Sequence, residues 1–375
     1  MEPPTAGSTV PRFGPLPAGV DIELTSRCNA SCSFCPRDQT PHQGLIDERT
    51  FTAALERAVQ YRDAVLELHR LQPGYLSTVD DTIFLSFCGM GEPLLHPRVV
   101  EYVRRAAEAG LRPIINTNGA LLSPDKAEDL MAAGLAMVCL NVGEIGEQYE
   151  EVYDLPFERT RFNVEHFLAA APGRCLAVIV LVDHRHDPDH ATSVREYWSE
   201  RGASAFLPFT LVNRAGALAL GEDVEDGQAF LHEAEKILAE GGGETGCWAP
   251  FMYPFIGYDG NYYLCSSDWR KEVNLGNVFE RSVADLIEDK VERVRSRSPI
   301  CRDCTHDPTN TLARALAAAV DVPTPGAPPE PAAATDEILA KLDHFSGCLS
   351  AMRTHLPRAS DGRGPVNRRL IPVRS

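Results

Sequence analysis

Three cysteines stand within eight residues near the start of the chain: Cys28, Cys32 and Cys35, in the stretch TSRCNASCSFCPRD. Their spacing is C-x3-C-x2-C, whereas zinc ribbons usually carry two C-x2-C pairs. Three thiolates in one short loop suit three irons of a cubane iron–sulfur cluster. They leave the fourth iron open, so that it can bind a small molecule directly. This loop is therefore a candidate site of iron–sulfur chemistry.

The segments around this loop alternate between short apolar runs and amphipathic helical patterns. Strands are predicted at 20–24, 82–87, 112–118, 136–142, 174–182 and 203–209, with helical periodicity between them. Six strand–helix units predict parallel strands joined by crossover helices, as an α/β sheet or an open barrel. Such folds place their sites at the carboxyl ends of the strands, and the cysteine loop follows the first strand there.

Composition and charge limit the partners of this chain of 375 residues. Its 36 Lys and Arg against 53 Asp and Glu give a net charge of −17, which disfavours nucleic acid as a partner. No apolar run reaches the ~18–20 residues of a membrane span, and the N-terminus lacks a secretory signal. We therefore expect a cytoplasmic protein with no membrane contact. Disulfides are rare there, so the eleven cysteines indicate metal binding or catalysis.

The cysteine loop resembles the signature of the radical S-adenosylmethionine (radical SAM) family, and CGMGEPLLHP resembles the family's glycine-rich SAM-binding segment, with Met90 in place of a glycine. The resemblance implies that Cys28, Cys32 and Cys35 hold a [4Fe–4S] cluster beside which SAM binds. An arginine common in the family is replaced near Tyr153 or Asp154. The SAM contacts that the resemblance implies are Gly89, Gly91, Glu92, Asn116, Asn118 and Asn141, the last where the family often has a serine.

A second set of cysteines follows the glycine-rich stretch at 240–246. A turn signal at Asp259-Gly260 between aromatic strand formers predicts a hairpin inside this set. The segment resembles the auxiliary-cluster module called twitch, a shortened SPASM domain, which implies a second, fully ligated [4Fe–4S] cluster suited to electron transfer. Structural zinc is the competing interpretation. The implied ligands are Cys247, Cys265, Cys301 and Cys304.

The predicted fold class is α/β, in four parts. A flexible lead (1–19) precedes a partial (β/α)6 radical SAM barrel (20–240). A small cysteine-rich, twitch-type α+β domain follows (241–310). The remainder (311–375) is predicted as a Pro/Ala-rich linker, a weak helix and a basic tail.

The resemblance also implies a reaction, in which a 5′-deoxyadenosyl radical made from SAM abstracts hydrogen from a C–H bond. Family members with one auxiliary cluster include amino-sugar and aminocyclitol dehydrogenases and epimerases of antibiotic biosynthesis. We expect a small polar substrate, because the short lead before Val20 leaves little room for a peptide-recognition domain. Dehydrogenation comes first, since a closed auxiliary cluster can accept an electron. A flavodoxin or ferredoxin would supply the initial electron.

Three alternatives stay open. A radical epimerase needs a thiol hydrogen donor, for which Cys88 and Cys139 are candidates, although free cysteines are more often small buried apolar residues. A peptide maturase would carry auxiliary clusters of the same type. A zinc-binding protein without catalytic activity would be colourless and would cleave no SAM.

Overall fold

The computed structural model describes residues 18–71, 83–183, 188–210, 213–218, 229–241, 246–320 and 331–355. Its strands are β1 Gly19–Ile22, β2 Phe84–Phe87, β3 Arg112–Thr117, β4 Met137–Asn141, β5 Leu176–Asp183, β6 Phe206–Thr210, β7 Phe255–Ile256, β8 Asn261–Tyr263 and β9 Asn274–Asn277. Its α-helices are α1 Glu48–Leu71, α2 Val99–Glu108, α3 Pro124–Ala132, α4 Gly146–Tyr153, α5 Phe157–Ala170, α6 Pro188–Ser199, α8 Leu231–Glu240, α9 Ala249–Met252, α10 Ile287–Arg295, α11 Pro299–Arg302, α12 Pro308–Val320 and α13 Pro331–His355. Short 3-10 helices lie at Pro36–Gln39 (η1), Pro93–Leu95 (η2) and Val283–Leu286 (η3).

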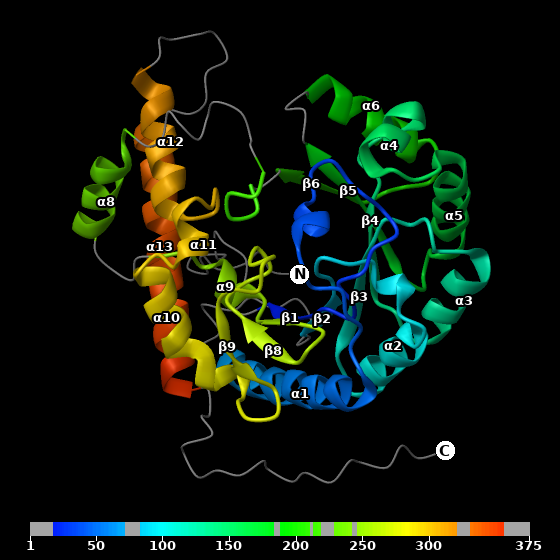
Figure 1. Ribbon diagram of the computed structural model, residues 1–375, viewed down its shortest axis with the longest axis horizontal. Coiled ribbons are helices and arrows are strands. Elements are labelled where there is room, and N and C mark those ends of the chain that lie inside the picture. Colours follow the sequence, from blue (N-terminus) through cyan, green and yellow to red (C-terminus); the bar gives the residue numbers. More distant parts are fainter. Residues whose placement is uncertain are drawn as a thin grey trace, which may run out of the picture.

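The strands form one sheet in the order β6-β5-β4-β3-β2-β1-β7-β8-β9. Strands β1 to β6 are all parallel, and the helices between them lie on the outside of the curved sheet (Figure 1). The six strands predicted from apolar runs are present, with ends shifted by a few residues. The predicted α/β fold with a partial barrel of six strand–helix units is thereby confirmed.

Residues alternate along each strand between the two faces of the sheet. One set, exemplified by Ile22, Leu85 and Ile115, is fully buried in the main core with the apolar faces of the helices. The opposite face lines the barrel interior, where Ile114 and Val180 belong to a separate small apolar cluster. The apolar side chains of the barrel interior therefore form a cluster that is separate from the main core.

Two local signals in the sequence act as predicted. The Ser123 side chain accepts a hydrogen bond from the Lys126 backbone N–H at the start of α3, and Pro124 occupies the first turn. At the expected hairpin between β7 and β8, Gly260 has φ +77°, which a glycine adopts without strain. The first feature fixes the start of α3, and the second fixes the turn before β8, which leads to Cys265.

The sheet continues across the predicted boundary between residues 240 and 241. Strand β7 pairs in parallel with β1, with Asp21 opposite Phe255, and β8 and β9 then add antiparallel strands. The cysteine-rich part is thus hydrogen-bonded directly to the first barrel strand.

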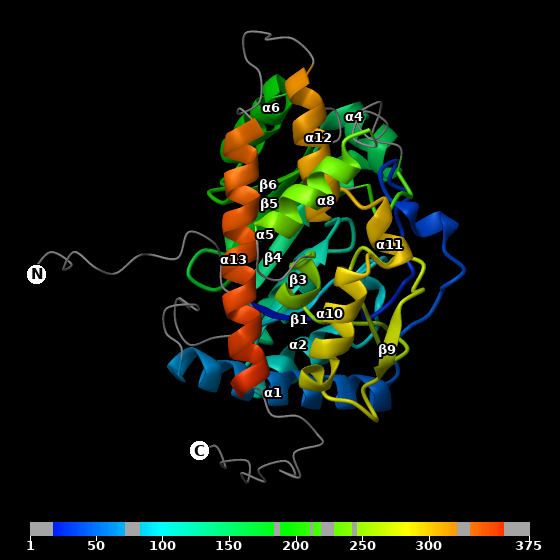
Figure 2. The same ribbon diagram turned by 90° about the vertical axis from the view of Figure 1, so that its left-hand side faces the viewer.

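The C-terminal part has one helix more than predicted. No helix was predicted at 308–320, which forms α12, whereas the predicted weak helix is present as α13 and begins at Pro331. α12 packs against α8 and α13, and α13 also contacts α1 (Figures 1 and 2). Phe345 of α13 is buried with its ring 4.9 Å from that of Phe251. The alanine-rich composition concealed α12, because its stability comes from tertiary packing.

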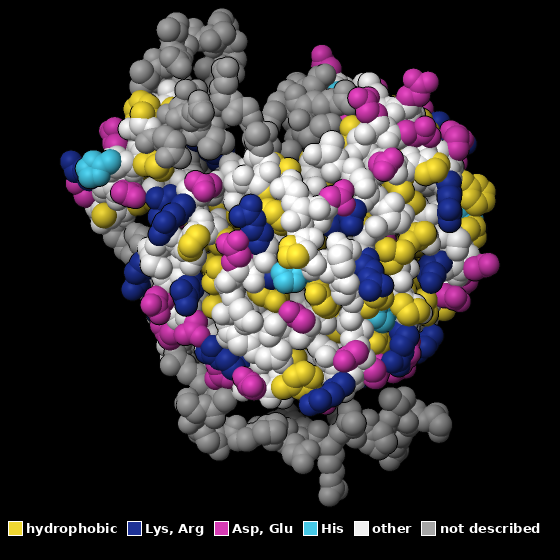
Figure 3. All heavy atoms as spheres, in the orientation of Figure 1, with side chains coloured by type: hydrophobic (Ala, Val, Ile, Leu, Met, Phe, Trp, Pro, Cys, Tyr) yellow, Lys and Arg dark blue, Asp and Glu magenta, His cyan; other side chains and the backbone are white. Residues whose placement is uncertain are grey.

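The described surface in Figure 3 mixes charges of both signs, with Lys and Arg side chains interspersed among Asp and Glu. No described helix combines the length and apolar character needed to cross a membrane.

Candidate functional site

The first cysteine loop is anchored on the C-terminal end of α4. The backbone N–H groups of Ser31 and Ser33 donate to the carbonyls of Tyr153 (3.3 Å) and Val152 (2.9 Å). Carbonyls in the last turn of a helix lack intrahelical partners, so the loop satisfies them. The Phe34 ring meets the Tyr153 ring edge-on at 5.5 Å between centroids. These contacts hold the loop at the carboxyl end of the barrel.

Tyr153 is therefore a framework residue, which the sequence showed only as a departure from the family pattern. Its hydroxyl oxygen accepts from the Gly143 N–H at 3.1 Å, and its ring stacks on Tyr149 at 4.6 Å. The Tyr149 hydroxyl in turn contacts the Asn118 carbonyl at 3.4 Å. This tyrosine pair ties the ends of β3 and β4 to the cysteine loop.

The structure brings the three thiols of this loop together. The Cys35 N–H donates to the Cys32 carbonyl at 3.0 Å, and the Asn118 amide nitrogen lies 3.9 Å from the Cys28 sulfur. Burial raises the pKa of Cys28 to about 11 and raises the pKa of Cys32 further, with repulsion between the thiolates adding to it. Thiolate ligation of iron would therefore release protons, as expected of a metal-binding cysteine set.

The glycine segment packs tightly against the start of this loop. A Cβ on Gly91 would lie 2.2 Å from the Thr25 carbonyl oxygen and 2.5 Å from that of Arg27. Gly89 has φ +145°, and a Cβ there would lie 2.6 Å from the Glu23 side chain. Both positions require glycine, because the backbone approaches its neighbours more closely than a side chain allows.

Glu92 joins the glycine segment to the end of β3. Its carboxylate accepts from the Leu94 N–H (3.0 Å), the Thr117 hydroxyl (2.8 Å) and the Asn118 N–H (2.9 Å). Burial raises the pKa of Glu92 to about 7, although these hydrogen bonds favour the carboxylate. Glu92 thus fixes the relative position of two strand ends.

The three asparagines predicted to line the site stand at neighbouring strand ends. The Asn118 amide donates to the Asn29 side chain at 3.0 Å, within the cysteine loop. The Asn116 amide donates to the Ser86 hydroxyl at 3.0 Å, and the Asn141 amide to the Thr117 carbonyl at 3.3 Å. All three predicted positions therefore meet around the carboxyl edge of the sheet.

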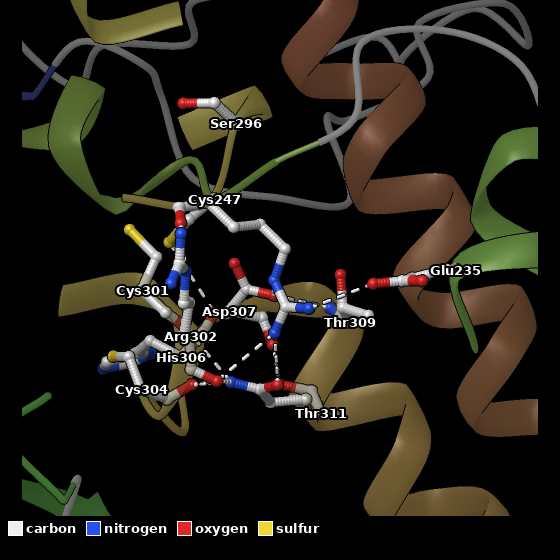
Figure 4. A network of polar contacts seen from close by, with 12 residues as sticks. Glu235, Cys247, Ser296, Cys301, Arg302, Cys304, His306, Asp307, Thr309 and Thr311 are labelled. Atoms are coloured by element: carbon white, nitrogen blue, oxygen red, sulfur yellow. Dashed lines mark hydrogen bonds and ion pairs between the residues drawn. The ribbon is translucent and has the colours of Figure 1, made fainter. Parts of the chain in front are cut away.

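The second cysteine set is assembled from separate elements: Cys247 precedes α9, Cys265 follows β8, and the other two lie at the end of α11 and just after it. Figure 4 shows Cys247, Cys301 and Cys304. Asn310 organises the C-x2-C turn, because its amide nitrogen contacts the carbonyls of Cys301 (3.2 Å) and Cys304 (2.9 Å). Asn310 was not apparent from the sequence, since nothing near it indicated a ligand or a cap.

An arginine supports this turn from behind. The Arg297 guanidinium donates to the Asn310 side-chain oxygen at 2.6 Å and lies 3.5 Å from the Asp307 carboxylate, which is itself buried. It also reaches Glu235 on α8 at 3.2 Å. The network in Figure 4 therefore links α8, the C-x2-C turn and the start of α12.

The donor chemistry of this second site fits an iron–sulfur cluster. Burial raises the pKa of all four thiols, that of Cys265 to about 12, and Cys304 adds to the shifts of the other three. Four buried cysteine thiols whose charges act on one another are a donor set that suits a [4Fe–4S] cluster.

Cys88 and Cys139, the candidate hydrogen donors, both belong to the barrel interior. Cys139 lies in the small apolar cluster with Ile114, and burial raises its pKa to about 11. Cys88 is hydrogen-bonded to Asp21, and Ser86 contacts both. Burial raises the pKa of Asp21 to about 7. Asp21 was missed within the predicted strand VDIEL, although an acidic residue in an apolar strand is itself a signal.

Comparison with known proteins agrees with this geometry. The model of the radical SAM superfamily matches residues 22–194, and that of the SPASM iron–sulfur cluster-binding domain matches residues 247–305. The chain is 29% identical over 219 residues to the AdoMet-dependent heme synthase of Methanosarcina barkeri (58% of this chain, 55% of that protein). It is 32% identical over 236 residues to a PqqA peptide cyclase of Gluconobacter oxydans (60% and 59%).

The chain thus spans less than two thirds of the length of either relative. Among solved structures, anSMEcpe with bound AdoMet has a TM-score of 0.55 at 15% identity, covering 91% of this chain and 99% of that one, which shows a shared fold. The two matched domains imply SAM, a SAM-binding [4Fe–4S] cluster and auxiliary iron–sulfur binding. The chain belongs to the radical SAM superfamily and is a radical SAM enzyme with a C-terminal SPASM iron–sulfur domain.

Proposed function

We propose that this enzyme oxidises a C–H bond beside a hydroxyl or amine of a small polar metabolite, such as an amino-sugar or aminocyclitol. When bound, SAM and its cluster supply the radical that abstracts the hydrogen atom, and the auxiliary cluster supplies an acceptor for one electron. The chain itself must bind the groups, orient the substrate and accept a proton.

The proposal assigns these groups to the residues already described. The ligands of the SAM-binding cluster are Cys28, Cys32 and Cys35, and those of the auxiliary cluster are Cys247, Cys265, Cys301 and Cys304. The SAM site is formed by Gly89, Gly91, Glu92, Asn116, Asn118 and Asn141. A flavodoxin or ferredoxin is the proposed reductant.

One observation supports oxidation in particular: buried titratable groups lie between the barrel interior and the auxiliary cysteines. Asp21 and Cys88 are in contact in the interior, and the charge of Lys290 on α10 acts on Asp21. Lys290 is buried, its ammonium donates to the Pro250 carbonyl at 2.7 Å, and it also interacts with Cys265. Groups that can exchange protons therefore lie between the two sites.

After the hydrogen atom is abstracted, the proposed step releases one proton and one electron from the substrate. Loss of a hydrogen atom from an H–C–OH group leaves a carbon radical. Loss of the hydroxyl proton and one electron then forms C=O. The Asp21 carboxylate is the proposed proton acceptor, and because burial raises its pKa to about 7 it is basic enough for this role near neutral pH. Cys247, Cys265, Cys301 and Cys304 would hold the cluster that accepts the electron.

Peptide modification is the second candidate. It is favoured by the similarity to PqqA peptide cyclases, one of which is 32% identical over 236 residues. A peptide substrate could be oxidised with the same auxiliary cluster, so the two candidates differ in what the barrel interior accepts. Binding of a precursor peptide would distinguish them.

The test begins with iron and sulfide content after anaerobic reconstitution. We expect about 8 irons in the wild type and about 4 in Cys301→Ala/Cys304→Ala, as two [4Fe–4S] clusters require. Equal iron in both proteins, with zinc in the wild type alone, would contradict the oxidative function.

The reaction type is then read from the products of an amino-sugar and aminocyclitol panel. Dehydrogenation predicts one 5′-deoxyadenosine and one carbonyl or imine product per turnover, with no solvent deuterium at the attacked carbon. It also predicts that Cys88→Ala remains active. One solvent deuterium per turnover, lost in Cys88→Ala or Cys139→Ala, would instead establish epimerisation.

A further inference from the structure

A buried ion pair links the glycine segment to the auxiliary domain. The Lys271 ammonium lies 2.7 Å from the Glu23 carboxylate, and both side chains are almost completely inaccessible, at 1% and 0% exposed. Glu23 follows β1 in the barrel, whereas Lys271 lies between β8 and β9. Neither residue belongs to the cluster ligands or SAM contacts assigned above.

The two oxygens of Glu23 face in two directions. One carries the ion pair with Lys271, and the other accepts the backbone N–H of Met90 at 3.0 Å. The Glu23 side chain also fills the space that a Cβ on Gly89 would need. The Glu23 side chain thus contacts the glycine segment at both Gly89 and Met90 and fixes the position of its backbone.

Lys271 is itself held in a fixed conformation. Its φ is +56°, in the left-handed region that non-glycine residues rarely adopt. The turn around it is closed by Asp268, whose carbonyl accepts the Lys271 N–H at 3.0 Å, while the Asp268 N–H donates to the Cys265 carbonyl at 3.1 Å. The Asp268 carboxylate accepts two further N–H groups, at 3.0 and 2.9 Å. The position of the ammonium therefore depends on the loop that carries Cys265.

An aromatic enclosure surrounds the ammonium of Lys271. The rings of Phe255, Tyr258 and Tyr263 lie 5.3, 5.8 and 5.0 Å from the nitrogen, within the range of cation–π attraction. These rings come from β7, β8 and the hairpin between them. They replace water around the charge and leave Glu23 as its anionic partner in the described contacts.

We propose that Lys271 is a positioning residue for SAM binding, which acts through Glu23 on the backbone of Met90. The geometry of the SAM-binding segment would then depend on the auxiliary-cluster loop, although Lys271 does not contact SAM. This inference rests on the proposed assignment of the glycine segment to SAM. Removing the lysine charge leaves a buried carboxylate without its cation, a loss that such pairs tolerate poorly.

The experiment measures SAM affinity by anaerobic equilibrium dialysis of the reconstituted holoenzyme, together with iron content and the EPR change that SAM causes in the reduced cluster. Lys271→Met is expected to keep about 8 irons and to bind SAM at least about tenfold more weakly than wild type, which corresponds to about 1.4 kcal/mol. Lys236→Met is the matched control, because Lys236 makes a 3.9 Å ion pair on an exposed helical surface.

Two charge-free double variants keep the test decisive if Lys271→Met alone fails to fold. Glu23→Gln/Lys271→Met retains an oxygen for the Met90 N–H, whereas Glu23→Leu/Lys271→Met does not. Replacing a buried ion pair by uncharged groups is often tolerated, so both should fold. The first is expected to bind SAM within about threefold of wild type and the second at least about tenfold more weakly, with the EPR change reduced in parallel.

Equal SAM affinity in the two double variants would overturn the inference, as would wild-type affinity in a Lys271→Met protein with full iron content. If Gly91→Ala binds SAM with the affinity of the wild type, that result would instead contradict the proposed SAM site itself. The two failures are therefore distinguishable.

Discussion

Asn310, near the start of α12, offers a stringent test of how the auxiliary site is built. Its amide nitrogen contacts the carbonyls of Cys301 (3.2 Å), Arg302 (2.8 Å) and Cys304 (2.9 Å). Its oxygen accepts from Arg297 at 2.6 Å. Asn310→Asp keeps the size and the acceptor but replaces the nitrogen by a second oxygen. The variant therefore removes both side-chain N–H donors to the turn without creating a cavity.

The magnitude follows from the number of hydrogen bonds lost. Two N–H bonds serve three carbonyls, so at least one bond is shared. Each carbonyl keeps one further donor, from the N–H of Cys304, the N–H of Asp307 or the Arg297 guanidinium, so the loss of two bonds costs about 1–3 kcal/mol. Repulsion between the new carboxylate oxygen and these carbonyls adds to this cost. The added charge would strengthen the contact with Arg297 and return a part of this. We expect a net destabilisation of the C-x2-C turn of about 3 kcal/mol, or roughly a hundredfold in its opening equilibrium.

The assay is the rate of iron release from the reconstituted enzyme to a chelator under anaerobic conditions. We expect half of the iron of Asn310→Asp to be released roughly a hundredfold faster than in wild type, while the half bound by the first loop is unaffected. Asn274→Asp is the control, because the exposed Asn274 uses only its oxygen, which accepts from the Gly276 N–H at 2.8 Å. Wild-type release from Asn310→Asp would refute the role given to its amide.

Three further predictions concern the barrel and the C-terminal helix. Gly91→Ala should abolish SAM binding measured by dialysis, because the added methyl would lie 2.2 Å from a backbone oxygen, whereas Gly146→Ala, with nothing within 4 Å but a φ of +60°, should lose some stability and retain SAM binding. Burial raises the pKa of Asp21 to about 7, so wild type should lose stability as pH rises from about 4 to 7, by up to about 4 kcal/mol. Asp21→Asn should remove this dependence, and an unchanged pH profile of the thermal midpoint would contradict it. Phe345→Ala should cost about 3–5 kcal/mol in denaturant unfolding, whereas Phe162→Ala, 58% exposed, should cost little.

The sequence predicted best those structural features that depend on residues close together in the chain. Strand periodicity, the Ser123 cap and the Asp259-Gly260 turn are local features, and all were found as predicted. The cysteine loop was recognisable because three ligands of one type lie within eight residues. Its position after the first strand then placed it at the carboxyl edge of the sheet.

Features that depend on distant partners were not predictable. Glu92 was recognisable as part of a motif that resembles a SAM-binding segment, but the hydrogen bonds of its carboxylate to groups at the end of β3 were not predictable. The pairing of Glu23 with Lys271 joins positions far apart in sequence, and no local pattern indicates which cation Glu23 pairs with. The helix at 308–320 was not predicted and the helix at 331–355 was predicted only as a weak one, because an alanine-rich sequence has a weak apolar face without its partners.

The parallel pairing of β7 with β1 has a consequence for how the chain is made. As the polypeptide leaves the ribosome, β1 gains its neighbour β2 early but keeps an open edge until residues 255–256 emerge. An open strand edge invites pairing with other chains, and contacts between distant segments form slowly. A chain cut at residue 240 would keep that edge permanently, so we expect it to aggregate in light-scattering measurements. The barrel is thus completed by the segment that follows it.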